Sequence, residues 1–348
     1  MATNRGHVDG YLDQVDAGEA DRIGGLPDHL LHGILIHLSD TIQVARTSVL
    51  SRRWRHVWSG LPELFFLNNT RPVPVAKAHD CVDAALAACS APTIRLLDIS
   101  MPYRKPLVPT NYVSRWLCFA SQRVAGELRL SLPFDHTRKE EEVLLPLCER
   151  LTAITIYLFR ILRFQLPPVG TFTVLATLRI QNTDIDGSEL ESVLSTRCPR
   201  LKELYLHSVT VIKHKDNVLS IRSHSIQRLE TDINFDGQLH VDTPELQAFY
   251  PCVPGNFYIS NSPKLSEVIW YSGLYDPTHH HFSALTGRHL RRLKTSTVFS
   301  PLPLMRRFDN VDELLLIVSI GKGIEEYKQF LETINGLPKC DVLVSSNV

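Results

Sequence analysis

Two short clusters in the sequence have side chains that could bind a metal ion. The run Asn182-x-Asp184-x-Asp186-Gly187 matches the first half of an EF-hand calcium loop, and His279-His280-His281 could present two imidazoles to a transition metal. Val193 stands where a calcium loop needs a bidentate glutamate, and no third ligand lies near the histidine run. We therefore interpret the first cluster as a loop that caps a helix and the second as a solvated loop.

Arginines also gather around an aromatic residue, with Arg52, Arg53 and Arg55 beside Trp54, a combination that can bind phosphate. No basic stripe extends this cluster, because Lys plus Arg and Asp plus Glu both number 37 and the net charge is zero. We expect the arginines to form the solvated face of a helix whose indole rings are buried. Nucleic acid is not an expected partner.

The sequence lacks the common catalytic and cofactor motifs. It contains no G-x-S-x-G, H-E-x-x-H, P-loop or G-x-G-x-x-G stretch. Its seven cysteines include no C-x-x-C pair, so neither a RING with zinc-spaced ligands nor a ligase with its own active cysteine is indicated. We expect no catalytic residue, no metal site and no cofactor, and any transfer chemistry is expected to belong to partners.

Composition indicates a globular protein of the cytoplasm or nucleus, with no membrane partner. Apolar residues make up 44% and charged residues 21%, and no apolar run approaches the length of a membrane span. The N-terminal segment has no apolar core of a signal peptide, and the odd number of cysteines fits reduced thiols. Residues 1–20 are acidic and poor in large apolar groups, so they are expected to form a disordered leader.

The elements that position these residues begin with three short helices over residues 21–64. Pro27 suits the start of a helix with a broad apolar face, Asp40 and Gln43 can form a variant capping box for a second helix, and the third carries Trp54 and Trp58 on one side. Of these 44 residues 18 are apolar, an excess that indicates a partner surface. Docking of the helices on the rest of the chain would explain the periodicity equally well.

The order and spacing of these residues resemble the F-box, especially the version in plant F-box proteins with leucine-rich repeats. The shared pattern is Leu26-Pro27-Asp28-x-Leu30-Leu31-x-x-Ile34-Leu35-x-x-Leu38, then Val49-Leu50-Ser51-Arg52-Arg53-Trp54-Arg55 and Trp58. The resemblance implies docking on a Skp-family adaptor and, through it, on a cullin-RING ubiquitin ligase. Carried over by position, the docking face would be formed or supported by Leu26, Pro27, Leu30, Leu31, Ile34, Val49, Leu50 and Trp54. Leu26 precedes a proline and is therefore held extended, as an anchor ahead of the helix.

After a linker and helix over residues 65–92, an apolar pattern repeats over residues 93–345. The template Z-x-x-Z-x-Z, with Z mostly aliphatic, starts at ten positions from Ile94 to Val311, about 24 residues apart on average, an interval typical of leucine-rich repeats. The last Z is Thr231, Pro251 or Thr295 in three repeats, which predicts short or irregular strands there. Short parallel strands alternating with helices predict an α/β solenoid.

The repeats resemble the degenerate leucine-rich repeats that follow the F-box in the same plant family, and the C-terminal end resembles the start of the FBD-type tail found there. Aliphatic Z side chains face the core, so the residues between and after the last two Z positions face the concave side, where a protein substrate would bind. These residues are Arg129, Thr155, Tyr157, Arg179, Gln181, Tyr205, His207, Glu230, Asp232, Tyr250, Tyr271 and Lys294. Their mixed charge and several tyrosines suit a protein ligand better than a phosphate backbone.

The sequence thus predicts a small three-helix F-box followed by a leucine-rich-repeat solenoid, acting as a substrate-recognition adaptor of a ubiquitin ligase. Such an adaptor contributes proximity and no catalytic group. Two other functions stay open. One is a scaffold that binds a Skp-family adaptor without substrate turnover, and the other is an enzyme within the repeats, which would need a deep pocket with perturbed titratable groups.

Overall fold

The structure is a computed structural model of the chain. It describes residues 23, 25–38, 40–49, 52–67, 78–101, 108–133, 142–159, 163–212, 217–253, 255–271, 273–284, 286–287, 289–296, 302–308, 310–318, 328, 335 and 339–347. The predicted leader at residues 1–20 lies outside the described residues, as does Leu50.

The first described elements are three short helices, as the sequence predicts. They are α1 (Asp28–Ile36), α2 (Thr41–Arg46), which continues into a 3-10 turn (Thr47–Val49), and α3 (Arg52–Ser59). The Asp40 side chain accepts a hydrogen bond from the backbone N–H of Ile42 at 2.9 Å, so the predicted cap of α2 is confirmed. Gln43 takes a different role from the one predicted, because its side chain accepts from Arg46. Leu31, Leu35, Val44 and Val57 are the buried side chains that hold the three helices together.

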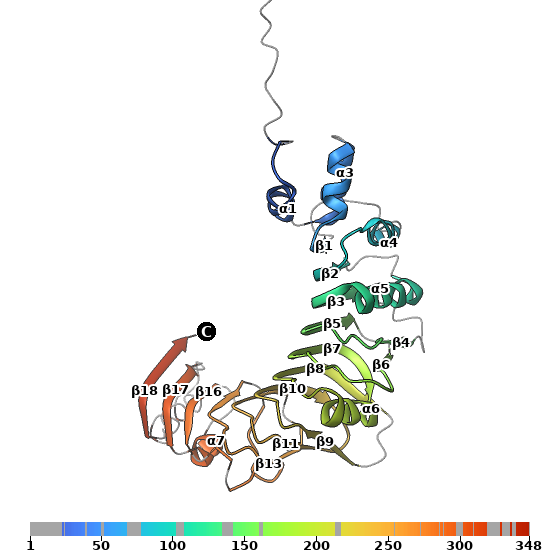
Figure 1. The fold of residues 1–348 in the computed structure, drawn as a ribbon. Helices are drawn as coiled ribbons and strands as arrows, with labels where there is room; N and C mark the ends of the chain where they lie inside the picture. Colours follow the sequence, from blue (N-terminus) through green and yellow to red (C-terminus); the bar gives the residue numbers. More distant parts are fainter. Residues whose placement is uncertain are drawn as a thin grey trace, which may run out of the picture.

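A long parallel sheet follows these helices and forms a curved arc (Figure 1). In spatial order its strands are β1 (Glu63–Leu67), β2 (Ile94–Ser100), β3 (Val124–Pro133), β5 (Ala153–Phe159), β7 (Thr177–Asp186), β8 (Glu203–Ile212), β10 (Arg228–Asn234), β12 (Ala248–Val253), β14 (Glu267–Trp270), β16 (Leu290–Ser296), β17 (Asn310–Val318) and β18 (Lys339–Asn347). Of two short strands, β6 (Arg163–Gln165) pairs with β7, and β4 (Glu142–Leu144) pairs with β6. Every neighbouring pair is parallel, as a solenoid requires.

The outer side of the arc differs between its two halves. In the first half it carries α4 (Ala78–Ala88), α5 (Thr110–Arg123) and α6 (Gly187–Ser192), whose last turn widens into a π-helical segment (Val193–Arg197) (Figure 1). In the second half it carries a second parallel sheet made of β9 (Val218–Arg222), β11 (Gln238–Asp242), β13 (Phe257–Asn261) and β15 (His280–Phe282). A further helix, α7 (Leu302–Arg307), precedes β17.

Repeat length accounts for only part of the replacement of the predicted helices by strands in the second half. Thr177 pairs with Glu203, which lies 26 positions later, whereas Arg228 pairs with Ala248, only 20 positions later. A strand advances about 3.3 Å per residue and a helix about 1.5 Å, so an extended segment suits a short repeat. Length alone does not decide the element, because β9 and β15 lie in repeats of 25 residues and α7 lies in one of 21. The α/β solenoid is confirmed, but strict alternation with helices is not.

The aliphatic template positions form the core of the solenoid. Leu201, Leu204 and Leu206 are fully buried, and the irregular positions Thr231 and Thr295 are also buried. The predicted irregularity is confirmed at Thr231, where the register of β10 shifts against both of its neighbours.

In the second half the space between the two sheets is filled by aromatic rings, with the Phe249 and Phe257 centroids 5.3 Å apart.

The sheet begins one strand earlier than the sequence predicts. β1 pairs with β2, so the end of the helical segment is also the first strand of the solenoid. The backbone N–H of Phe65 in β1 donates to Thr41 Oγ1 of α2 at 2.8 Å, and Ser59 Oγ lies 2.9 Å from Ser90 Oγ. Because the buried side chains of the helices and the solenoid form one continuous cluster, the two parts are held as one body.

A glycine in β3 allows the close approach of β2. Gly126 has φ +156°, and a Cβ at this position would collide with the carbonyl oxygen of Arg95, where the register between the two strands shifts. We expect Gly126→Ala to lower the free energy of unfolding by about 2 kcal/mol, because backbone must move to admit the methyl group. A urea unfolding curve measures the change.

Gly33 in α1 provides a matched control, because an added Cβ there meets no atom within 4 Å. Alanine is the better helix former, so Gly33→Ala should leave the unfolding midpoint unchanged or raise it. A Gly126→Ala protein as stable as the parent would contradict the close approach described above.

Cysteine accessibility gives a second test of the fold. Burial raises the pKa of the Cys148 and Cys198 thiols to about 12, whereas Cys118 lies exposed on α5. Since the thiolate is the reacting form, we expect alkylation of Cys148 and Cys198 to be more than about 100-fold slower than that of Cys118 in the native protein. Pulsed labelling with mass spectrometry measures the rates, and equal rates would show that these repeats are not packed as described.

Within the described part of the chain, no helix has both the length and the apolar character that crossing a membrane demands.

Candidate functional site

One face of α1 carries apolar side chains that the described chain leaves exposed. Leu30 and Ile34 lie about one turn apart on α1 and Leu38 lies in the turn just after the helix, and the three are 47%, 45% and 47% exposed. We call these three residues the α1 stripe. Leu31 and Leu35, on the adjoining side of the helix, are buried in the core. The broad apolar face that the sequence predicts is therefore divided into a buried half and an unpartnered half.

The remaining predicted docking residues lie around the start of α1 and the end of the 3-10 turn. Pro27 is exposed and Val49 is 82% exposed, whereas Leu26 and Trp54 are half-buried and pack against the core. Leu31 is fully buried, so it can only support a docking surface from below. Leu50 lies outside the described residues.

Arg53 connects the start of α1 to α3. Its guanidinium hydrogen-bonds to the carbonyl oxygen of Leu26 and to Asp28 Oδ1, the latter at 2.8 Å. The hydrogen bond from Arg53 holds the pKa of the Asp28 carboxyl below its usual value. Arg52 and Arg55 are exposed as predicted, but Trp54 and Trp58 are half-buried where full burial was expected. Arg53 thus fixes the backbone that presents Leu26 and Pro27.

The second candidate surface is the inner face of the arc. Arg129, Thr155, Arg179, Tyr205 and Glu230 are direct neighbours on successive strands, so the structure brings these predicted residues into one row. A parallel row contains Tyr157, Gln181 and His207. Farther along the sheet, Lys294 Nζ lies 4.9 Å from the ring centroid of Tyr271. The predicted concave residues therefore share one face of the large sheet, as placed by its register.

Arginine side chains cover two tyrosine rings at the centre of this face. The Arg179 guanidinium lies 3.7 Å from the Tyr205 ring centroid, and the Arg228 guanidinium lies 4.4 Å from that of Tyr250. As a result Tyr205 is only 4% exposed, although the sequence places it on a solvated face. Burial, together with Glu267, raises the pKa of Tyr250 to about 12. A partner would meet the arginines before the rings.

Sequence reasoning missed a row of charged residues that lies two positions earlier along each strand, on the same face of the sheet. Arg129 Nε donates to Glu127 at 2.7 Å, and Arg292 Nε donates to Glu313 at 2.8 Å. Arg228 likewise donates to Glu230 at 2.9 Å. The signal was present, because these residues precede the second Z of the template by one position and period-two alternation puts them on the concave side. Ion pairs within strands and between neighbouring strands therefore cover much of the surface.

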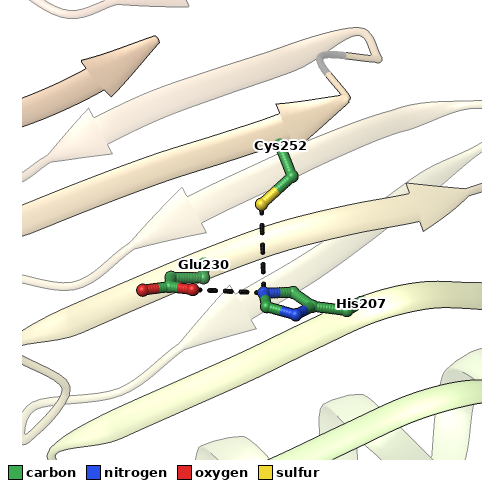
Figure 2. A group of neighbouring side chains, drawn as sticks. All are labelled: His207, Glu230 and Cys252. Carbon is green, nitrogen blue, oxygen red and sulfur yellow. Dashed lines mark hydrogen bonds and ion pairs between the residues drawn. The ribbon is translucent and has the colours of Figure 1, made fainter. Parts of the chain in front are cut away.

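A group of three side chains lies beside the arginine-covered tyrosines (Figure 2). His207 Nε2 is 3.1 Å from Glu230 Oε2 and 3.9 Å from Cys252 Sγ. The contacts with Cys252 and with Glu230 raise the pKa of His207 to about 9, against the opposing effect of burial. Burial would raise the pKa of Glu230, but hydrogen bonds from His207 and Arg228 outweigh it and leave that pKa below its usual value. Cys252 was missed because Pro251 occupies the preceding aliphatic position and hides the alternation.

Asp232 lies next to this group and binds backbone. Its Oδ2 accepts from the N–H and from the hydroxyl of Ser208, both at 3.0 Å. Ser208 adopts φ +50°, so the carboxylate stabilises an unusual backbone conformation just after His207. The Asp232 carboxylate thus already accepts hydrogen bonds within the chain.

The two metal-like motifs of the sequence have structural roles. Asp186 caps α6 by accepting from the N–H groups of Ser188 and Glu189 at 3.0 and 3.3 Å, so the capping interpretation is confirmed. The solvated-loop interpretation of the histidine run is wrong for His280, which is buried in β15 and stacks on Phe257 with centroids 5.2 Å apart. Its Nδ1 accepts a hydrogen bond from the Asp276 N–H at 2.9 Å, so this ring nitrogen already has a partner within the chain.

Three helices with an unpartnered apolar stripe, joined to a curved parallel solenoid with a charged inner face, define a two-part protein-interaction fold. Comparison with known families agrees with this description. Residues 23–66 match the F-box domain, and residues 113–282 match the LRR repeats of the FBD-associated F-box protein At5g56370. The chain therefore carries an F-box followed by leucine-rich repeats of the FBD-associated type, which confirms the resemblance seen in the sequence.

Curated relatives from Arabidopsis thaliana carry the F-box in their names, together with leucine-rich repeats or an FBD association. The chain is 30% identical over 241 residues to the putative F-box/LRR-repeat protein At4g15060, covering 67% of this chain and 55% of the relative. It is 27% identical over 239 residues to the putative FBD-associated F-box protein At5g56390, covering 65% and 54%. Similarity to the FBD-associated F-box protein At5g38590 is 28% over 260 residues, covering 71% and 60%. The chain thus spans little more than half the length of these relatives.

Proposed function

We propose that this chain is the substrate-recognition adaptor of a Skp-cullin-F-box ubiquitin ligase. The F-box would dock on a Skp-family subunit and the solenoid would bind a protein to be ubiquitinated. The observation that carries the proposal is the α1 stripe, since within the described residues three aliphatic side chains of the F-box stay exposed on one helix face.

The α1 stripe has the chemistry of a docking surface. Burying one aliphatic side chain contributes about 1.5 to 3 kcal/mol, so Leu30, Ile34 and Leu38 together can supply much of the free energy of a stable complex. Leu26 and Pro27 extend the apolar surface ahead of the helix, where Arg53 fixes their backbone. Low charge and high apolar content at the centre of a surface are typical of protein interfaces.

The junction between the two parts supports a mechanism based on proximity. The core is continuous from α1 to the solenoid, and the hydrogen bond from Phe65 to Thr41 ties the first strand to the helices. A substrate held on the inner face would therefore keep a defined distance from a ligase held by the F-box. Ubiquitin transfer would then proceed as an effectively intramolecular reaction whose chemistry belongs to the partners.

One hollow within the described chain has the lining of a packed core rather than of a catalytic pocket. It lies between the two sheets and is lined mainly by apolar side chains such as Ile233, Phe235 and Leu239, with no titratable residue in its lining. Catalytic pockets usually combine concavity with perturbed titratable groups. We therefore propose a non-catalytic subunit, and location in the cytoplasm or nucleus stays a prediction.

Charge reversal on the inner face tests the substrate-binding role. We expect Arg179→Glu with Arg228→Glu to reduce the recovery of proteins that accumulate on the chain under proteasome inhibition by at least about tenfold, because like-charge contacts would replace complementary ones. Quantitative mass spectrometry of co-purified proteins measures the recovery, and Skp-family binding should be unchanged.

Arg222→Glu on the outer strand β9 is the matched control, since Arg222 is an exposed arginine of the same half of the solenoid. If both proteins recover the same partners equally, the inner face is not the substrate surface. If the recovered partners show unchanged half-lives after depletion of the chain, the non-degradative scaffold replaces the ligase adaptor.

A further inference from the structure

Three side chains with the chemistry of metal ligands converge on one point of the inner face (Figure 2). They are His207 on β8, Glu230 on β10 and Cys252 on β12, and their ligand atoms all lie within 4.8 Å of one another. The three strands are consecutive neighbours in the large sheet. The relative positions of the three residues are therefore fixed by paired backbone rather than by flexible loops.

The arrangement does not match a cysteine nucleophile with its base. In such a relay the imidazole faces the thiol with one nitrogen and the carboxylate with the other. Here the same nitrogen, Nε2 of His207, faces both Glu230 Oε2 at 3.1 Å and Cys252 Sγ at 3.9 Å. Three donor atoms around one point are what a bound cation needs.

The distances are close to those of a tetrahedral zinc site. With Zn–N and Zn–O of about 2.0 to 2.1 Å and Zn–S of about 2.3 Å, tetrahedral ligand atoms lie roughly 3.3 to 3.6 Å apart. The separations of Glu230 Oε2 and Cys252 Sγ from His207 Nε2, 3.1 and 3.9 Å, differ from that range by a few tenths of an ångström, and the third pair lies within 4.8 Å. Small side-chain rotations would bring all three atoms into coordination, with the fourth position facing solvent.

The surroundings orient one ligand and balance its charge. Arg228 donates from Nη2 and Nε to Glu230 Oε1 at 2.9 and 3.1 Å, so Oε2, whose partner is the His207 ligand nitrogen itself, is the oxygen placed to act as a monodentate ligand. A thiolate and a carboxylate together neutralise a divalent cation. All three residues are only half-buried, so an ion can reach them from solvent.

We propose that His207, Glu230 and Cys252 bind one divalent transition-metal ion of the zinc type, with water in the fourth position. Binding forms three ligand–metal bonds, and the thiol proton and the imidazolium proton pass to solvent. The combination of thiolate and imidazole selects zinc or cobalt over magnesium or calcium. The site lies on the proposed substrate face, but metal binding there does not require the ubiquitin-ligase role.

Cobalt titration of the reduced full chain tests the proposal. We expect one equivalent of Co²⁺ to produce a thiolate-to-cobalt charge-transfer band, and Zn²⁺ to displace it. Cys252→Ser should abolish the band, and His207→Gln and Glu230→Gln should each weaken binding by at least about tenfold. Cys118→Ser and His281→Gln are the controls, since both positions are exposed elsewhere on the chain and should leave binding unchanged.

Two further measurements separate a loss of metal binding from a loss of folding. Melting curves of the metal-free variants show whether each one folds, and X-ray absorption of the unaltered chain with Zn²⁺ should give one sulfur and three nitrogen or oxygen ligands without any substitution. Absence of the charge-transfer band at saturating Co²⁺ would overturn the proposal. A band that persists in Cys252→Ser, or a zinc shell without sulfur, would do so as well.

Discussion

Replacing Ile34 by aspartate is expected to weaken binding of the chain to a Skp-family adaptor by more than about 100-fold, which corresponds to about 2.7 kcal/mol. Ile34 lies at the centre of the α1 stripe and is 45% exposed in the free chain. The substitution removes an aliphatic contact and places an unpaired charge in an apolar interface, and both changes oppose binding. Because the side chain is not part of the core, the protein itself should remain folded.

His29→Asp is the matched control for this experiment. His29 is exposed on the same helix but lies away from the α1 stripe by the helical period, and an acidic residue in the first turn suits the helix dipole. We expect its affinity for the adaptor to equal that of the parent, as measured by isothermal titration calorimetry. If Ile34→Asp also binds with parental affinity, the α1 stripe does not form the docking surface.

Replacing Phe249 by alanine is expected to lower the free energy of unfolding by about 3 to 5 kcal/mol. This ring is fully buried between the two sheets, where its centroid lies 5.3 Å from that of Phe257 and 6.3 Å from that of Phe282. The outer elements described on either side of Phe249 in the chain, β11 and β13, are strands, and aromatic rings fill much of the space between the two sheets here. The cavity left by alanine would have no neighbour able to close it.

Tyr258→Ala separates this packing effect from a general loss of an aromatic ring in the same region. Tyr258 is exposed on β13 and stacks on His240 at 5.3 Å between centroids. Removing this ring should lower the free energy of unfolding by no more than about 1 kcal/mol, as measured by denaturant unfolding. Equal losses for the two proteins would contradict the two-sheet core.

Much of the fold could be predicted because its signals are local and regular. Leu201, Leu204 and Leu206 follow a fixed aliphatic spacing, and each repeat with that spacing became a strand of the large sheet. β1 was missed because it lacks a repeat of its own and gains its partner, β2, only about 30 residues later. The outer strands of the second half were missed because they carry no distinctive local pattern.

The sequence predicted which face of the sheet the candidate residues occupy, but not which of their side chains contact one another. Period-two alternation placed Arg179, Tyr205 and Glu230 on one side of the sheet, and the register confirms this placement. It could not reveal that Arg179 covers Tyr205, because that depends on the register between two strands. The His207 and Cys252 contact joins residues 45 positions apart, and such pairings are set by the stacking of repeats.

The central claim is that the helical segment docks this chain on a Skp-family adaptor, and calorimetry of the unaltered chain with a purified adaptor tests it most directly when paired with hydrogen exchange of the complex. We expect one-to-one binding with a Kd of about 1 µM or tighter, and slower exchange of the amides of α1 and α3 in the complex. Absence of binding, or a complex that protects only strands of the solenoid while α1 exchanges at its free rate, would contradict it.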